Sequence, residues 1–338
     1  MRRRGERGFT LIELVTSMAV GLTVTTMVTG SLIMYQKNSN RELDFTQAQQ
    51  NARASLAILE HYLRQTGYGV STSASSGVVA IGSCSAVDTI SCNAVDAGSD
   101  RLRLASADAT TMDSQALWEP GKSLLRSQKK ANYGGGATCP PAIPNGTKIV
   151  ISGPCPAAGG ANVSSVLTID KDVNSGQYCH AYQWSGTLGC ANYDDNQTLQ
   201  SGTYREVDFY ISRTDPAHPT LMLDPDGSGA AAAVPVAYDI DDLQIQYGVD
   251  TSTPDPDRAV EMWCNQLALS SCATGLADDH TNQSRVIAVR VAVVARTPVA
   301  DPGYTSPSVT AADHTIPGGD GYVRWVYRSV IRLRSINP

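Results

Sequence analysis

Hydrophobic residues are most concentrated near the start of the chain, where an almost unbroken apolar run extends from Phe9 to Met34. About 20 apolar residues are enough for a helix to cross a bilayer, so this run predicts a membrane-spanning helix. Four arginines precede it within residues 1–8, and positive charge of this kind stays on the cytoplasmic side. One carboxylate, Glu13, interrupts the apolar run. A charge inside a membrane segment is costly, and it therefore indicates a functional role.

The residues after the apolar run predict a continuation of the same helix. No proline or glycine occurs between Tyr35 and Thr66, and Gly67 and Gly69 end the pattern. A coiled-coil dimer would need several clean heptads, which this segment lacks. Apolar residues recur instead at spacings of three and four, which is typical of a helix with one face packed on a domain. They are Ala48, Ala52, Leu56, Leu59 and Leu63, and Phe45, Ser55, Ile58 and Tyr62 widen the stripe.

Beyond the helix the pattern changes to loops and alternating strands. Residues 67–160 are rich in turn-forming residues and predict a loop-rich, variable region with short strands at 101–105 and 147–152. Residues 161–338 predict a more regular antiparallel sheet. The fold class is therefore α+β, with a long N-terminal helix packed on an antiparallel β domain. The strands expected in the second region are 161–169, 179–184, 204–213, 220–223, 236–249, 285–297 and 322–336.

Eight cysteines lie beyond the membrane segment and predict disulfide bonds formed in an oxidising compartment. Eight cysteines allow about 105 pairings, so the connectivity stays open, and pairing between sequence neighbours is the simplest arrangement. No C-x-x-C motif occurs, which argues against a zinc ribbon or a thioredoxin-like site. The disulfide candidates are Cys84, Cys92, Cys139, Cys155, Cys179, Cys190, Cys264 and Cys272.

No motif in the sequence predicts catalysis, so we expect no enzyme activity and no cofactor. G-x-S-x-G and H-E-x-x-H are absent, and the five histidines are scattered without ligand spacing. Asp170, Asp172 and Asn174 match the first half of a calcium-binding loop, but Ala181 occupies the position of the bidentate acid. A polar hairpin turn explains these three residues equally well. The formal net charge of −6 leaves no basic domain for nucleic acid.

A secretory signal peptide and a plain anchor are the simpler explanations of the N-terminal segment. The apolar run is too long for a cleavable signal, and a plain anchor does not explain Glu13. Residues 8–14, GFTLIEL, resemble the class III signal of type IV prepilins and type II secretion pseudopilins. The resemblance implies cleavage after Gly8 by the prepilin peptidase, methylation of Phe9 and a role for Glu13 in assembly. Residues 1–8 are then the leader, 9–34 the membrane and assembly helix, and 35–66 its amphipathic continuation.

The C-terminal third carries a second resemblance. Residues 241–250, DDLQIQYGVD, are similar to a segment of PilW-type minor pilins, in which strands like 284–296 and 322–334 follow. Membership of this family implies a pilin-like fold and a single-pass precursor in the bacterial inner membrane, with its N-terminus in the cytoplasm. The chain then joins a periplasm-spanning or extracellular fibre. The implied partners are other minor pilins, the major pilin and a tip adhesin.

These resemblances imply a minor pilin that primes type IV pilus assembly at the fibre tip, supporting cell adhesion or twitching motility. In the implied mechanism, Glu13 pairs with the methylated N-terminal amine of a neighbouring subunit and sets the axial register of the helices. Two alternatives stay open. One is a J-like minor pseudopilin of a type II secretion system. The other is a subunit that binds a ligand or a tip adhesin through the loop-rich residues 69–160.

Overall fold

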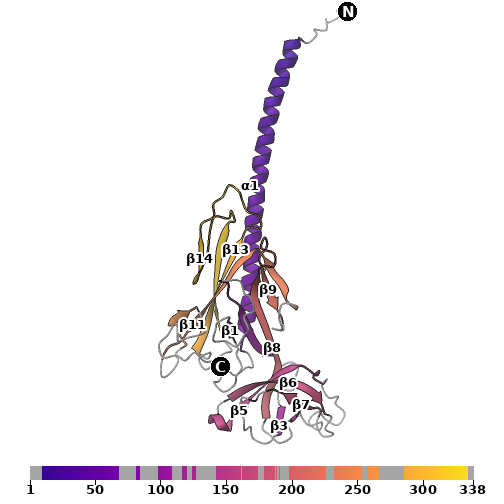
Figure 1. The fold of residues 1–338 in the computed structure, drawn as a ribbon, viewed down its shortest axis with the longest axis vertical. Helices are drawn as coiled ribbons and strands as arrows, with labels where there is room; N and C mark the ends of the chain where they lie inside the picture. Colours follow the sequence, from indigo (N-terminus) through magenta and orange to yellow (C-terminus); the bar gives the residue numbers. More distant parts are fainter. Residues whose placement is uncertain are drawn as a thin grey trace, which may run out of the picture.

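One long helix and several antiparallel β-sheets make up the protein, which confirms the predicted α+β, pilin-like class. In Figure 1 the N-terminal half of the helix projects alone, and the sheets gather around its C-terminal half. The structure is a computed structural model. It describes residues 10–67, 81–83, 98–108, 116–119, 124–126, 142–160, 162–173, 179–186, 188, 190, 198–225, 232–252, 258–265 and 285–333.

The helix α1, Leu11–Gln65, is continuous over 55 residues, as the sequence predicts. At a rise of 1.5 Å per residue this corresponds to a rod of about 80 Å. Leu56, expected in the buried stripe, is only partly buried, because the observed spacing centres the stripe on Ser55 instead. The side chains of the helix that are buried against the sheets are Ala48, Ala52, Ser55, Leu59 and Leu63.

A four-stranded antiparallel sheet packs against the helix, with the strand order β12-β11-β13-β16. Alternate side chains of its central strands, among them Leu243, Ile245, Val291 and Val293, enter the core that they share with the helix. The hairpin β14–β15 packs on the opposite face, where it covers Ala292 and Val294. Both faces of β13 are therefore buried, which explains its nearly continuous apolar sequence. The bounds are β11 Ile240–Val249, β12 Met262–Cys264, β13 Val286–Arg296, β14 Val309–Ala311, β15 His314–Ile316 and β16 Arg324–Arg332.

The strand expected at 236–249 is wrong in its extent, because the chain breaks within it. Asp239 has a φ of 59° and separates β10 from β11. A positive φ is uncommon for a residue other than glycine, although aspartate is among those that tolerate it. The strand β10, Val234–Tyr238, consequently pairs with β9, Thr220–Asp224, while β11 enters the other sheet.

The strand β8, Thr198–Ser212, links two parts of the β domain. Its second half pairs with β2, Leu102–Asp108, and with β9, and contributes Val207, Phe209 and Ile211 to the core under the helix. The short strand β1, Ile81–Ser83, pairs with β2. The first half of β8 pairs with other strands and belongs to a barrel.

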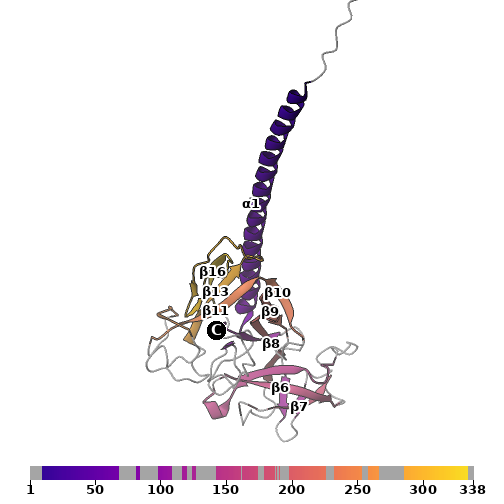
Figure 2. The same cartoon turned by 45° about the horizontal axis from the view of Figure 1, so that its top comes forward.

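Six strands form a closed ring at the end of the molecule furthest from the start of the helix. Each strand pairs with the next in the order β8-β3-β4-β7-β6-β5, and β5 pairs back with β8. Figures 1 and 2 show this barrel below the sheet that packs on the helix. It has its own core, which includes Leu125, Ile149, Leu167 and Ile169. The remaining bounds are β3 Ala116–Glu119, β4 Leu124–Arg126, β5 Lys148–Pro154, β6 Asn162–Asp172 and β7 Ala181–Ser185.

The predicted division at residue 160 falls inside this barrel. The strands on either side of it, β5 and β6, pair over seven residues, from Lys148↔Thr168 to Pro154↔Asn162. A 3₁₀ turn, Pro156–Ala158, connects them. The sequence could not show this pairing, because an apolar or alternating pattern indicates a strand but not the strand with which it pairs.

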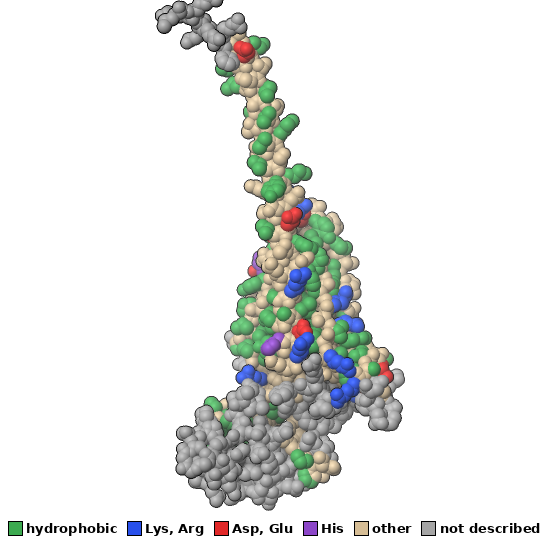
Figure 3. Space-filling view, turned by 180° about the vertical axis from the view of Figure 1, so that it is seen from behind, with side chains coloured by type: hydrophobic (Ala, Val, Ile, Leu, Met, Phe, Trp, Pro, Cys, Tyr) green, Lys and Arg blue, Asp and Glu red, His purple; other side chains and the backbone are tan. Residues whose placement is uncertain are grey.

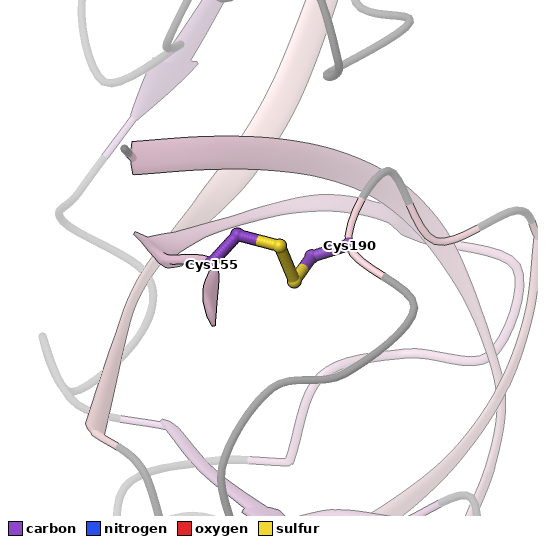
Figure 4. The surroundings of a disulfide bond; sticks show 2 residues. All are labelled: Cys155 and Cys190. Atoms are coloured by element: carbon purple, nitrogen blue, oxygen red, sulfur yellow. A yellow bond between two sulfur atoms is a disulfide. The ribbon is translucent and has the colours of Figure 1, made fainter. Parts of the chain in front are cut away.

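One disulfide in the barrel overturns the simplest pairing of the cysteines. Cys155 is bonded to Cys190, 35 residues away, rather than to Cys139 (Figure 4). Both cysteines belong to the barrel core, so the fold brings them together across the barrel and not along the chain. Cys179 is also disulfide-bonded, but not to its sequence neighbour Cys190, and Cys264 is disulfide-bonded as well. The candidates Cys84, Cys92, Cys139 and Cys272 lie outside the described residues.

Candidate functional site

The first half of α1 is the largest exposed apolar surface in the described part of the chain. Its large apolar side chains are more than half exposed, for example Leu11 at 83% and Met34 at 71%. Figure 3 shows them projecting on a single helix with no covering element. The helix is long and apolar enough to span a membrane. A surface of this kind needs either lipid or other apolar helices around it.

Glu13 lies at the start of this helix and forms a capping box with Thr10. The Glu13 carboxylate accepts hydrogen bonds from the Thr10 backbone N–H and from its hydroxyl, each at 3.1 Å. The Glu13 backbone N–H donates in return to the Thr10 hydroxyl at 3.4 Å. Such a box satisfies N–H groups that the first helical turn leaves unpaired, and a negative charge there interacts favourably with the helix dipole. The carboxylate is therefore held at the very end of the exposed apolar half.

The predicted cleavage and methylation sites, Gly8 and Phe9, lie outside the described residues. Their roles stay predictions, as does the assembly role of Glu13. Thr10, the first described residue, directly follows the amine that cleavage would create.

The second half of α1 is fixed to the β domain by contacts along its length. The ring of Phe45 packs edge-on against Trp325 of β16, with ring centroids 4.5 Å apart. The Asn51 side chain donates to the Tyr238 carbonyl at 2.9 Å. Tyr62 contacts Phe209 of β8 in a second edge-on pair, at 5.4 Å between centroids. These contacts join the exposed half of the helix to the globular domain as one continuous element.

A buried charge cluster explains the acidic start of β11, which the sequence presents only as a family-like segment. Asp241 lies at a β-bulge between Ile240 and Asp242 and is 2% exposed. Its carboxylate accepts from Nε of Arg324 at 2.6 Å and lies 3.2 Å from Nη1 of Arg296. Both arginine side chains are almost fully buried as well. A buried carboxylate with two guanidinium partners stabilises this geometry, whereas removing one partner would leave a costly unpaired charge.

The same arginines fasten two loops to the sheet. Arg296 donates to the carbonyls of Pro216 and Ala217 at 2.8 and 2.7 Å. Arg324 also donates to Asp320, and this hydrogen bond holds the pKa of the Asp320 carboxyl well below its usual range. The function of this cluster is thus structural. Sequence reasoning missed it because the partners are separated by more than 50 residues; the signal was two adjacent aspartates inside a strand pattern.

A second polar cluster attaches residues 98–100 to β11. Asp242, fully buried, accepts from Ser99 Oγ at 2.7 Å and lies 2.8 Å from Nδ1 of His314. The Asp100 carboxylate accepts from the Ile245 N–H at 2.7 Å. Burial raises the pKa of Asp100 to about 7, and the nearby carboxylates of Asp313 and Asp242 add to this shift. The cluster joins the sheet under the helix to the start of β2.

The calcium candidates do not form a loop of their own in the described residues. Asp170 and Asp172 lie at the end of β6, where Asp170 accepts from Ser185 Oγ at 2.8 Å. Asp172 lies 2.8 Å from Nδ1 of His180 and accepts from the Ala181 N–H at 3.3 Å. Asn174 lies outside the described residues. Within the described part of the chain, no group of three metal-ligating side chains occurs. Calcium binding stays a prediction.

Comparisons with known proteins agree with this arrangement at both ends of the chain. Residues 3–29 match the model of the prokaryotic N-terminal methylation motif. Residues 208–335, from the second half of β8 to the end of β16, match the model described as type IV pilus-assembly protein W. Searches of curated proteins and of solved structures found no match. The barrel lies almost entirely between the two matched segments.

An exposed apolar helix with a methylation motif, fixed at its far end to an antiparallel β domain, defines the class of pilin-like proteins. Within that class, the match over the core sheet supports a type IV pilus minor pilin of the PilW type. This agrees with the resemblance in residues 241–250. The two matches imply contact with other pilins and with a prepilin peptidase, and PilW is a family of pilus-assembly proteins rather than of enzymes.

Proposed function

We propose that this chain is a non-enzymatic minor pilin that joins other minor pilins to prime type IV pilus assembly. The prepilin peptidase cleaves between Gly8 and Phe9, Phe9 is methylated, and the helix then leaves the inner membrane for the fibre. The observation that best supports this proposal is the exposed apolar half of α1. It begins at a single carboxylate in a capping box, and it continues into the half of the helix that is packed on the β domain. A mere anchor needs no such continuity between membrane segment and domain.

In this proposal Glu13 forms an ion pair with the methylated amine of a neighbouring subunit. Within a bundle of apolar helices, leaving either charge unpaired costs several kcal/mol, so the pair favours one axial register. A position at the fibre tip belongs to the same proposal. The barrel lies at the end of the molecule opposite the apolar half of the helix (Figure 1).

Two substitutions separate the charge of Glu13 from its capping role. Glu13→Gln keeps a side-chain oxygen for the capping box, in which glutamine is accepted, but it removes the charge. Glu13→Ala removes both. If the ion pair sets register, both variants lose pili by electron microscopy while immunoblots show normal precursor processing. Normal pilus numbers in Glu13→Gln cells would show that the charge is not required.

Deletion of the gene distinguishes the pilus from the secretion alternative. Loss of surface pili with normal export of type II substrates is the result that we expect. Normal piliation with loss of that export would instead identify a J-like minor pseudopilin.

A second candidate function, binding through the barrel, has a specific observation in its favour. The barrel has its own core and its own disulfide and lies outside the segments that match the family models. Asp108 of β2 and Thr203 of β8 are directly paired, so residues 109–202 can be replaced by a two-residue Asn-Gly turn to give a plain hairpin. Cells with this deletion should retain pili and lose adhesion if the barrel binds a ligand or tip adhesin. Loss of pili would assign the barrel to assembly instead.

A further inference from the structure

The last strand of the sheet, β16, has an open edge. Among the described residues it pairs only with β13, from Ala288↔Arg332 to Arg296↔Arg324, without a register shift. Backbone hydrogen bonds just outside this ladder, Leu333 N–H to Ile287 and Thr297 N–H to Val323, show that odd-numbered residues face β13. Because hydrogen-bonded pairs alternate in an antiparallel ladder, the N–H and C=O groups of the even-numbered residues point to the open edge.

The side chains of the even-numbered residues lie on the face of the sheet that is turned away from α1. Near the start of β16 this face is covered by the hairpin β14–β15, through Val326. Toward the end of the strand it is open: Arg328 and Arg332 are exposed, and Val330 between them is 58% exposed. The exposed segment therefore offers an apolar side chain flanked by two cations, together with backbone groups that pair with no other described strand.

The arginines here have neutral partners. Arg328 donates to the Thr310 carbonyl at 3.4 Å and Arg332 to the Arg258 carbonyl at 2.7 Å. Arg290, which is opposite Val330 on β13, donates to the Gln246 side chain at 3.1 Å and lies over the Trp263 ring. None of these three forms an ion pair with a described carboxylate, in contrast to the buried Arg296 and Arg324.

Figure 3 shows this side of the molecule from behind. Lys and Arg side chains gather among hydrophobic ones on the right-hand flank of the globular domain, the flank that carries β14 in Figure 1. The concentration of positive charge contrasts with the formal net charge of −6 for the whole chain.

Charge decides which strand can occupy this edge. Two copies of β16 paired antiparallel about Val330 would place Arg328 opposite Arg332 twice, and like charges directly opposite each other destabilise a strand pair. A second copy of this strand is therefore disfavoured. A strand with carboxylates four residues apart, around an apolar residue, would instead place one acid opposite each arginine and the apolar side chain against Val330.

We propose that the open edge of β16, from Arg328 to Arg332, binds an extended acidic segment of a partner polypeptide by strand addition. The backbone ladder supplies the affinity in this mode of recognition, and the side chains on one face supply the specificity. The carboxylates pair with Arg328 and Arg332, and Arg290 adds a third positive charge across the sheet. This inference does not depend on the assembly role proposed above.

Fluorescence anisotropy on the full-length protein in detergent tests the proposal. The probe is a labelled nine-residue peptide in which two glutamates flank a central valine at alternate positions, and its control carries two lysines instead. We expect the glutamate peptide to bind at least about tenfold more tightly than the lysine peptide. The combined substitution Arg328→Glu and Arg332→Glu should reverse this order.

Substitutions at Val330 test the backbone part of the interaction. Val330→Pro removes an N–H that points to the open edge, so it leaves the ladder with β13 intact, whereas Val330→Thr keeps that N–H. Thermal unfolding confirms that both variants are folded. Loss of peptide binding in the proline variant alone supports strand addition. No binding to the wild type, or equal binding to the proline variant, would overturn the proposal and leave the arginines as guards against aggregation at an exposed edge.

Discussion

Replacing both Cys155 and Cys190 by alanine should destabilise the barrel and leave the sheet under the helix intact. The two cysteines are 35 residues apart, and closing a loop of that length stabilises a fold by about 4 kcal/mol in the chain-entropy model. Both side chains are 1% exposed within the barrel core, so small packing losses add to this effect. Their removal should therefore cost about 4 kcal/mol of barrel stability.

The effect should stay local because the two cores are separate. The barrel core contains no residue of α1, β11 or β13, and β8 is the strand that the barrel shares with the helix-bound part of the domain. Hydrogen exchange followed by mass spectrometry measures both parts in one experiment. Amides of β5, β6 and β7 should exchange much faster in the double variant, while those of β11 and β13 keep their protection. Equal loss of protection in β13 would refute the claim that the barrel is a separate cooperative unit.

Three further substitutions test the core and the buried charges. Leu59→Ala, at a fully buried position of α1, should cost about 2–5 kcal/mol in urea unfolding, and the exposed Leu43→Ala should cost little. Asp241→Asn should cost about 3–5 kcal/mol, because the buried Arg296 loses its carboxylate partner and Arg324 keeps only Asp320, and a neutral effect would contradict that account. The pKa of Asp100, raised to about 7, means that its ionisation disfavours the folded state, so wild-type stability should fall as pH rises from about 4 to 7. Asp100→Asn should remove this loss of stability at high pH, so the variant should be more stable than the wild type by about 2–4 kcal/mol at pH 8. The difference should vanish near pH 4. Equal midpoints of urea unfolding at pH 8 would contradict the argument.

The N-terminal helix of the protein could be predicted from sequence alone. The apolar run, the position of Glu13 and the three- and four-residue spacing up to Leu63 depend only on local periodicity, and the structure places them on one continuous helix. The fold class followed for the same reason, since the period-two alternation of β8 and the nearly continuous apolar run of β13 are both visible along the chain. Both family matches fall on these regular segments.

Only the tertiary structure decided how distant segments meet. The barrel closes because β5 pairs with the start of β8, some 50 residues later, and this closure brings Cys155 to Cys190 instead of to a sequence neighbour. The charges of β11 likewise have their partners on strands and loops far along the chain, and whether an arginine is buried against Asp241 or exposed on an open edge depends on its place in the sheet. Local periodicity carries no information about such contacts, because they depend on strand order and register rather than on the residues themselves.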